Sequence, residues 1–560
     1  MRILGMMVHS GPPLAWVAAF AFVLQGCAAS MGAPTTVKCG PDRTPCSASP
    51  YADTAWATVH ASPRNDDYVP IELSGRYERY WSVLEGYATL MSPSLGPDGH
   101  IYVTTPSEQG TSTLHAFAPD GLPIWESKPW LGPNDLDSCA GFQTPIVDED
   151  GDLYLSDCNQ VWSVTSKGRV RWVVDLPKPP PGTAWQYGLA GPVNPFVTAF
   201  FTRDGAVGGV TMWGDIVLLS RHDGRLVAAP TRMPGSTALR EDELPRGLGV
   251  EPPPGVWTGG FMDPEMIPVV WYLFEGVVPS ANTPAMDPAT GRFFVTGLSR
   301  SLDDDRGALY AFDFIPGRDG KLGHVDVAFE FMIGGGSGSS PGISPDGATV
   351  YVSDGAGVLY AVDARTGGAK WSLPTSSQQA SPSVGADGMI YLLGGKAGFA
   401  VHPNGTEAWT ANLDSLAESH VPPLQAESPL SGPSTFHNAV PTITKSGVLT
   451  SVTVGYLASL GALTVIPVAV SQFVVLLDRQ TGALVDNFQP IRLTDTVEGF
   501  VVATSDGLLL ANQGALVSTT LRSLAGSFEP LLPNGVSLIP PVGGLQAFRP
   551  ASEHRASRGP

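Results

Sequence analysis

The cysteines are the residues with the clearest chemical potential in this sequence of 560 residues. There are five, and none belongs to a Cys-x-x-Cys or Cys/His cluster of the kind that holds zinc. Cys27 follows the apolar N-terminal run and is considered with it. The other four cysteines are an even number, which is typical of disulfides in an oxidising compartment. Of three possible pairings, proximity favours Cys39 with Cys46 and Cys139 with Cys158, and four free thiols are the alternative.

Acidic and histidine residues give weaker signals. The run Asp148–Asp152 is similar to the start of a calcium loop, but Asn159 stands where the bidentate Glu of an EF-hand would fall. We interpret that run as an Asp-Gly turn between strands, and Asp303–Asp305 as a solvated loop. The ten histidines are scattered, and neither HExxH nor an intact GxSxG occurs, so the sequence supports no zinc protease or α/β-hydrolase.

Composition narrows the class of protein. Charged residues are only 15% of the chain, and 65 Gly and 52 Pro are spread along it, which excludes a coiled coil and favours an all-β protein with many turns. The net charge is −20, whereas a nucleic-acid-binding protein needs a basic surface, so no nucleic acid partner is expected. Anionic lipid headgroups would also repel such a chain.

The N-terminus has the features of an export signal. Arg2 precedes the apolar run Leu14–Leu24, which is too short to cross a bilayer as a mature helix. The run ends in Leu24-Gln25-Gly26-Cys27, which resembles the bacterial lipobox. The resemblance implies that residues 1–26 are cleaved and that Cys27 becomes an acylated N-terminus, with an ordinary secretory signal as the alternative. Ala28 in place of Asp implies the outer membrane, facing the periplasm or the cell exterior.

Internal repetition organises the rest of the chain. A Ser/Thr-Pro or related start is followed by an Asp-Gly-type turn and then by an apolar strand, as in Ser92-Pro93, Asp98-Gly99 and Ile101–Val103. Asp-Gly between apolar runs indicates a tight hairpin, because Gly adopts positive φ and Asp tolerates it. The copies begin at residues 92, 144, 194, 283, 340, 381, 440 and 498.

Each copy predicts about four short strands, which is the content of one propeller blade. We therefore expect an all-β, eight-bladed β-propeller of four-stranded blades over residues 78–550. The strand around Tyr80–Val83 has no blade of its own and is expected to complete the last blade and close the ring. The uncharged stretch Ser446–Leu477 is interpreted as buried strands of the seventh blade, because it is rich in Val and Thr and interrupted by Gly.

Three segments fall outside this repeat. Residues 27–77, rich in Ser, Thr, Pro and Ala, are predicted to form a tether that is partly ordered near its end. Residues 551–560 form a short tail. An insertion at about 228–280, with a second at 415–432, is expected to sit on one face of the ring, where propellers usually carry partner contacts.

One segment resembles a known motif. Residues Ala361, Asp363, Thr366, Gly367 and Trp371 have the Ala-x-Asp-x-x-Thr-Gly-x-x-x-Trp spacing of the tryptophan-docking motif. That motif is found in the pyrroloquinoline quinone (PQQ)-type repeat family of eight-bladed propellers, and the resemblance covers about residues 80–548. It implies that a docking Trp fills the gap between blades while its N–H finds a backbone partner. The expected docking residues are Trp125, Trp172, Trp371 and Trp409.

The same resemblance implies two functions. The family contains PQQ-dependent alcohol dehydrogenases and also cofactor-free members, among them the propeller lipoprotein of the outer-membrane β-barrel assembly machinery. The dehydrogenases carry adjacent cysteines against the quinone, and no Cys-Cys occurs here. We therefore expect a binding or scaffold protein without catalysis and without a cofactor, which contacts envelope proteins or glycans through one face and the membrane only through the Cys27 lipid. The alternative is a PQQ-dependent oxidoreductase, using Ca²⁺, with an atypical site.

Overall fold

The computed structural model describes the chain from residue 49 to residue 551. The gaps in this range are residues 107–108, 180–185, 188–190, 239–279, 281, 301–305, 336–338, 376, 378–379, 395–396, 425–429, 437–439, 460–464, 491–499 and 515–542. Cys27, Cys39, Cys46 and the tail after residue 551 therefore lie outside the described residues.

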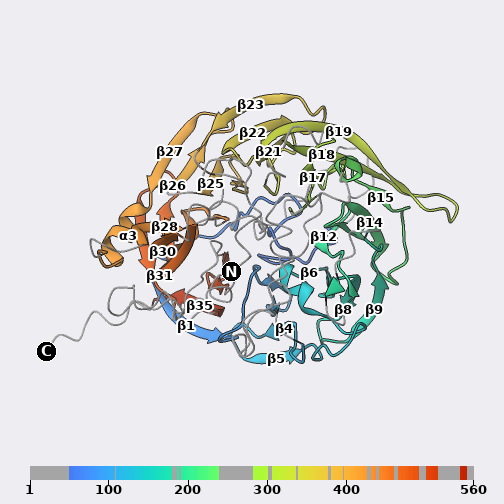
Figure 1. Ribbon diagram of the computed structural model, residues 1–560, viewed down its shortest axis with the longest axis horizontal. Coiled ribbons are helices and arrows are strands. Elements are labelled where there is room, and N and C mark those ends of the chain that lie inside the picture. Colours follow the sequence, from blue (N-terminus) through green and yellow to red (C-terminus); the bar gives the residue numbers. More distant parts are fainter. Residues whose placement is uncertain are drawn as a thin grey trace, which may run out of the picture.

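Eight antiparallel sheets stand around one axis and form the predicted propeller (Figure 1). We name the blades A to H in chain order. Blade A consists of β2 (Ser94–Leu95), β3 (Ile101–Thr104), β4 (Leu114–Phe117) and β5 (Pro123–Glu126), and blade B of β6 (Ile146–Val147), β7 (Leu153–Ser156), β8 (Gln160–Val164) and β9 (Val170–Asp175). Blade C consists of β12 (Phe196–Phe201), β13 (Ala206–Thr211), β14 (Asp215–Ser220) and β15 (Thr231–Arg232). Blade D consists of β16 (Ala285–Met286), β17 (Phe293–Leu298), β18 (Arg306–Ile315) and β19 (His324–Gly335).

The second half of the ring repeats this pattern. Blade E consists of β20 (Gly342–Ile343), β21 (Thr349–Ser353), β22 (Val358–Asp363) and β23 (Ala369–Pro374), and blade F of β24 (Ser383–Val384), β25 (Ile390–Gly394), β26 (Ala397–Val401) and β27 (Glu407–Asn412). Blade G consists of β29 (Thr442–Ile443), β30 (Gly447–Ser459), β31 (Val465–Asp478) and β32 (Leu484–Phe488). Blade H consists of β33 (Val501–Ala503), β34 (Leu509–Gln513), β35 (Gly544–Pro550) and β1 (Tyr77–Val83). In every blade the first strand begins two or three residues after the predicted repeat start.

The N-terminal strand closes the ring, as the sequence predicts. Strand β1 pairs antiparallel with β35, and the register runs from Tyr77 opposite Pro550 to Val83 opposite Leu545. The last blade therefore joins the two ends of the domain. This pairing covers the edge of β35, and β1 becomes the outer strand of the last blade.

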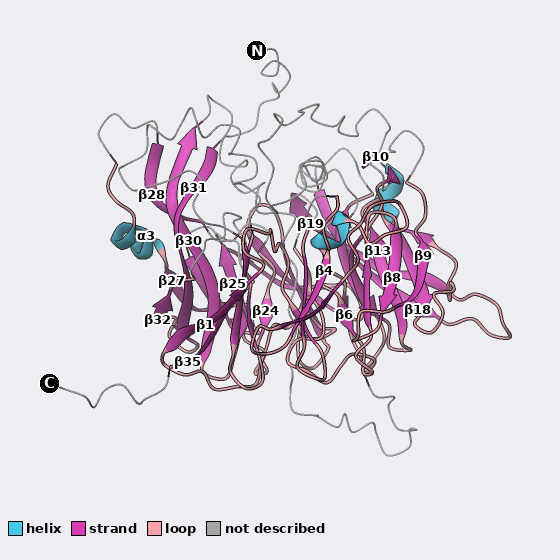
Figure 2. Ribbon diagram, turned by 90° about the horizontal axis from the view of Figure 1, so that it is seen from below, coloured by secondary structure: helices cyan, strands magenta, loops and turns pink. Residues whose placement is uncertain are grey.

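The predicted seventh-blade strands are confirmed. Strands β30 and β31 cover nearly the whole uncharged stretch, and they extend beyond the face of the ring in Figure 2. The second insertion supplies α3 (Asp414–His420) and β28 (Leu430–Phe436). Strand β28 pairs with the C-terminal half of β30. The remaining described elements are two 3-10 helices, η1 (Ser138–Phe142) and η2 (Pro234–Ala238), and a two-stranded sheet of β10 (Gln186–Tyr187) and β11 (Gly191–Pro192). No helix in this part of the chain is long and apolar enough to span a membrane.

The part of the predicted tether that the structure describes, residues 49–77, is ordered. Residues 49–71 lie inside the ring, where Trp56, Val59 and Val69 are completely buried. The apolar side chains explain why: burying them in the centre stabilises the fold, whereas a tether would leave them in water. We call residues 49–71 the axial segment.

The first insertion also begins differently from its prediction. Residues 228–238 are part of the propeller, because they contain the outermost strand of blade C, β15, and the helix η2. The main part of the insertion, residues 239–279, lies outside the described residues.

Candidate functional site

The predicted docking tryptophans lie between neighbouring blades. In blade E, the Trp371 Nε1 donates to the Pro403 carbonyl oxygen in blade F at 2.9 Å. Trp125, Trp172 and Trp409 donate in the same way to the carbonyls of Ser166, Arg221 and Arg479, at 2.8 to 3.0 Å. These indoles bridge blades and do not line an open site.

A glycine in the next blade receives each ring. A Cβ added to Gly405 would lie 2.7 Å from the ring of Trp371, so only glycine permits the contact. The motif glycine, Gly367, has a φ of 75°. Asp363 stabilises the turn around it by accepting the backbone N–H and the hydroxyl of Thr366, both at 2.8 Å. These hydrogen bonds hold the pKa of the Asp363 carboxyl below its usual value. Ala361, behind the ring, is completely buried.

Two further docking residues were not recognised from the sequence. Trp81, in the closing strand β1, covers Gly121 of blade A, and Phe329 of blade D covers Gly367 of blade E. In four blades the docking Trp follows its own turn glycine by four residues, as in Gly367 and Trp371. This spacing could have identified docking residues from the sequence, but Trp81 and Phe329 do not follow a glycine by four residues.

The junction between blades C and D is built without such a ring. There the backbone of residues 227–229 pairs with Gly323, with Ala229 N–H to Gly323 O at 3.0 Å and Gly323 N–H to Val227 O at 2.8 Å. A Cβ added to Gly320, in the β18–β19 turn, would meet no atom within 4 Å. No ring from the described part of blade C covers this turn; the ring of Phe314, in blade D itself, lies 2.8 Å from the position that a Cβ on Gly323 would take.

The axial segment is bound to the innermost strands of six blades. One backbone N–H from each of blades A, B, D, E, F and G donates to a carbonyl of this segment at 2.5 to 2.9 Å. The donors are Leu95, Val147, Met286, Ile343, Val384 and Ile443. The Asn65 side chain adds hydrogen bonds to the carbonyls of Thr283 and Pro341. The segment therefore satisfies inner-strand N–H groups that would otherwise need water.

A buried pair of polar side chains stabilises the axial segment. His60 Nδ1 lies 3.2 Å from Asp67 Oδ1, and the other carboxylate oxygen of Asp67 accepts the Ser383 hydroxyl of blade F at 2.6 Å. Burial lowers the pKa of His60 well below its usual value, so the imidazole is neutral at pH 7. Ser383 and His60 both bind the carboxylate, so this is not the arrangement of a nucleophile with its base.

The expected pairing of Cys139 with Cys158 is present as a disulfide with a Cα–Cα distance of 4.9 Å. Beside it, one oxygen of Asp137 accepts the backbone N–H groups of both cysteines, at 2.9 and 3.2 Å. The adjacent Asp157 is buried, which raises the pKa of its carboxyl to about 7, and it accepts the Trp162 Nε1 at 2.6 Å. The cysteine sulfurs are oxidised to each other, so they are not metal ligands in this state.

The residues around this disulfide do not fit a quinoprotein cation site. In the described part of the chain, Asp137, Cys139 and Cys158 are the one group of acidic, His and Cys side chains close enough to share an ion. Calcium prefers six to eight oxygen ligands, whereas this group offers sulfur and a carboxylate that backbone N–H groups already occupy. The acidic run at Asp148 forms a turn instead, with the Asp148 carboxylate accepting the N–H groups of Asp150 and Asp152.

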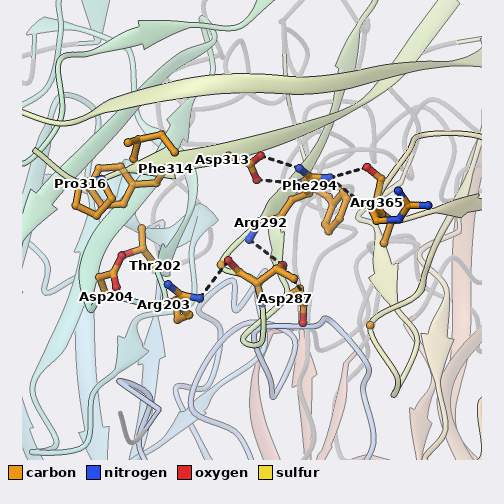
Figure 3. Close-up of a pocket in the computed structure, with 15 residues that line it drawn as sticks. Thr202, Arg203, Asp204, Asp287, Arg292, Phe294, Asp313, Phe314, Pro316 and Arg365 are labelled. Atoms are coloured by element: carbon orange, nitrogen blue, oxygen red, sulfur yellow. Dashed lines mark hydrogen bonds and ion pairs between the residues drawn. The ribbon is translucent and has the colours of Figure 1, made fainter. Parts of the chain in front are cut away.

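A cavity of about 560 Å³ opens beneath the projecting β18–β19 hairpin, where blades C, D and E meet (Figure 3). Its apolar lining includes Phe294, Phe314, Ile315 and Pro316. Its volume is in the range of ligand pockets. The residues come from turns and strand ends of three blades, which is why no local sequence pattern identified them.

The charged groups around this cavity are unequally paired. Arg292 makes a two-point ion pair with Asp313, at 2.8 and 2.7 Å, and also donates to the carbonyls of Ala364 and Arg365. Asp287 accepts the backbone N–H and hydroxyl of Thr290 within its own turn. These pairings leave the Asp287 and Asp313 carboxylates committed to groups of the protein itself.

Known proteins resemble this chain mainly in fold. Residues 305–487 match the family model described as "Outer membrane protein assembly factor BamB". No match to a curated protein sequence was found. Among solved structures, a europium-containing methanol dehydrogenase superposes with a TM-score of 0.51 and 11% identity over 88% of this chain and 98% of that one. The quinohemoprotein alcohol dehydrogenase ADHIIG from Pseudomonas putida HK5 gives 0.51 and 12% over 90% and 82%. BamB from Moraxella catarrhalis gives 0.43 and 13% over 85% and 100%.

The eight-bladed fold agrees with the resemblance that the tryptophan-docking motif indicates. The segment that carries this motif, within residues 305–487, is the part of the chain that matches the BamB family model. The two dehydrogenase structures share only the fold with this chain, at 11% and 12% identity, and a shared fold does not choose between a scaffold and an enzyme.

Proposed function

We propose that this chain is a lipid-anchored propeller of the bacterial outer membrane that binds envelope proteins or glycans and has no catalytic activity. The observation that carries the proposal is the match of residues 305–487 to a family of outer-membrane assembly factors. The lipobox at Cys27 agrees with that address. The ring would hold the partner on one face, and the lipid would hold the ring at the membrane.

The described interior supports binding over catalysis. The axial segment occupies inner-strand groups of six blades, and it places apolar side chains such as Trp56 along the axis. The acidic groups nearest the disulfide are committed to backbone N–H groups. A scaffold needs a rigid ring with exposed turns, and the inter-blade hydrogen bonds of the docking tryptophans supply that rigidity.

The second candidate function, a PQQ-dependent oxidoreductase, is favoured by the likeness to two dehydrogenase structures. Bound PQQ would supply a two-electron oxidant for an alcohol or sugar. Its use requires a cation site of oxygen ligands, and the one described cluster of possible ligands, at Asp137, does not provide such a set.

Two experiments test these functions. Full-length protein expressed in a diderm bacterium is labelled with a clickable palmitate analogue, and wild type should carry the label in the outer-membrane fraction while C27S carries none. The soluble protein, residues 28–560, is titrated with PQQ and Ca²⁺ and assayed by dye reduction over a panel of alcohols and sugars. Stoichiometric uptake with turnover would replace the scaffold by the oxidoreductase; label on C27S would refute the anchor.

A further inference from the structure

The cavity beneath the β18–β19 hairpin has an apolar side that is open to water. Phe314 is half-buried, Ile315 at the end of β18 is 43% exposed, and Pro316 in the turn is also exposed. All three line the cavity, and Figure 3 shows Phe314 and Pro316 above Arg203 and Asp204. Exposed apolar surface that lines a cavity is typical of a binding site.

The polar side of the cavity presents both charges in a single turn. Arg203 and Asp204 are consecutive exposed residues between β12 and β13, and both line the cavity. The Arg203 guanidinium donates to the carbonyls of Ala289 and Thr290, at 3.3 and 3.4 Å, which are long contacts. Among the described residues, the Asp204 carboxylate has no hydrogen-bond or ion-pair partner. The turn therefore places an acceptor beside a donor, and the two charges offset each other.

The lining as a whole carries no net formal charge. Its charged residues are three arginines and three aspartates: Arg203, Arg292, Arg365, Asp204, Asp287 and Asp313. An anionic ligand would meet three carboxylates, and a cationic ligand would meet three guanidinium groups. A neutral molecule with several hydroxyls meets neither penalty, because each hydroxyl both donates and accepts hydrogen bonds. The charges of the lining therefore favour a neutral polyhydroxyl ligand.

We propose that this cavity binds a neutral saccharide. The C–H face of a sugar ring, which is apolar, would pack on Phe314, Ile315 and Pro316. Two neighbouring hydroxyls would bind the β12–β13 turn, one donating to the Asp204 carboxylate and the other accepting from the Arg203 guanidinium. The inference rests on the proposed binding function, gives it a glycan as ligand and locates it at blades C to E.

The test titrates the mature protein, in detergent, with disaccharides of different charge and follows binding by calorimetry. The neutral disaccharides are cellobiose, maltose, lactose and di-N-acetylchitobiose. Digalacturonate is the acidic one and the glucosamine dimer of chitosan is the basic one. At least one neutral disaccharide should bind with a Kd of about 1 mM or below. The acidic and basic disaccharides should bind at least about tenfold more weakly, because each meets like charges in the lining.

A variant of the polar side tests the balance of charges. D204N should weaken the neutral disaccharide about tenfold, because a charged acceptor becomes a neutral one. The same variant should bind digalacturonate more tightly than wild type, because the lining then has an excess of positive charge. The matched control is D150N in blade B, where Asp150 is also exposed and followed by a glycine but does not line the cavity. Equal effects of D204N and D150N would overturn the proposal.

A variant of the apolar side tests the packing of the sugar ring. I315D should weaken the neutral disaccharide at least about tenfold, because it replaces apolar contact surface by a charge. Leu322 belongs to the same hairpin and is 51% exposed, but it does not line the cavity. L322D should therefore leave the affinity unchanged, and equal losses in I315D and L322D would contradict the proposal.

Two further arms identify the source of the saccharide and separate this site from the binding function itself. The disaccharide that binds is coupled to beads through its reducing end. Retention of wild type but not of D204N would indicate the end of a glycan chain, whereas binding of the free disaccharide alone would indicate a free sugar; both results keep the site. Binding of none of the disaccharides would refute the site, while the label on Cys27 and the PQQ titration would still decide the proposed function. Protein adducts at a photo-crosslinking residue in position 315, with no saccharide bound, would replace the saccharide by a protein partner.

Discussion

The indole N–H of Trp371 and the carbonyl oxygen of Pro403 are 2.9 Å apart and belong to adjacent blades. This single hydrogen bond joins the outer strand of blade E to the turn of blade F that contains Gly405. Related contacts from Trp81, Trp125, Trp172 and Trp409 repeat it around the ring. The blades are thus joined at their rims by side chains, whereas the axial segment joins them at the centre by backbone hydrogen bonds.

Removal of one rim contact should weaken the whole ring. We expect W371A to lower the free energy of unfolding by roughly 3 kcal/mol, because a large ring is lost and a cavity remains. W371F should cost about 1 kcal/mol, since it keeps most of the apolar contact and loses the hydrogen bond. Urea unfolding measures both. L131A, at an exposed leucine, is the control and should change stability by less than about 0.5 kcal/mol.

A pair of glycines tests the close approach of the ring. Gly405 and Gly320 have positive φ, 85° and 76°, so alanine at either position adds backbone strain of about 1 kcal/mol. Only at Gly405 would the new Cβ collide with a ring, that of Trp371. G405A should therefore destabilise the protein by at least about 2 kcal/mol more than G320A. Equal losses in thermal unfolding would mean that strain alone accounts for the glycine.

Hydrogen exchange tests the position of the axial segment. The amides of Leu95, Val147, Ile343 and Val384 donate to this segment, so they should be protected in a protein that begins at residue 49. In a protein that begins at residue 77 they should exchange at least a hundredfold faster. Amides within β21 and β25, which pair inside their own blades, serve as the control. Unchanged protection of the four amides would show that the segment is not bound along the axis.

The stability of the protein should depend on pH through a buried histidine. Burial lowers the pKa of His115 to about 4, and its imidazole contacts the Thr105 hydroxyl at 3.2 Å. In the unfolded chain this pKa is about 6.5. Between these values the unfolded state binds a proton that the folded state does not. Stability from this group is therefore complete above pH 6.5 and is lost as the pH falls toward 4.

The loss between pH 7 and pH 5 from His115 should be roughly 2 kcal/mol, and H115Q should reduce the acid sensitivity by that amount. His60, whose pKa burial also lowers, contributes to the remaining sensitivity. H222Q, at an exposed histidine in a turn of blade C, is the matched control. Urea unfolding at pH 5, 6 and 7 gives the comparison, and parallel curves for wild type and H115Q would contradict the assignment.

The sequence alone determined the architecture, because the architecture depends on local and repeated features. Asp-Gly turns at Asp98 and Asp387 mark the same hairpin in different blades, and a repeating unit of four strands has few ways to bury both faces except by stacking around an axis. The closing strand β1 was also predictable, since an unassigned strand at the N-terminus matches an incomplete blade at the C-terminus. The role of Trp371 followed from the motif that contains it.

Only the tertiary structure decided the position of the axial segment and of the cavity. Residues 49–71 show no strand periodicity, because their hydrogen bonds go to six different blades and not to a neighbouring strand. The cavity joins Arg203 and Asp287, in turns of blades C and D, with Phe314 near the end of strand β18, and these residues are distant in sequence. Each of these turns is ordinary by itself. Their chemistry arises from the closing of the ring, which places turns of three successive blades around one space.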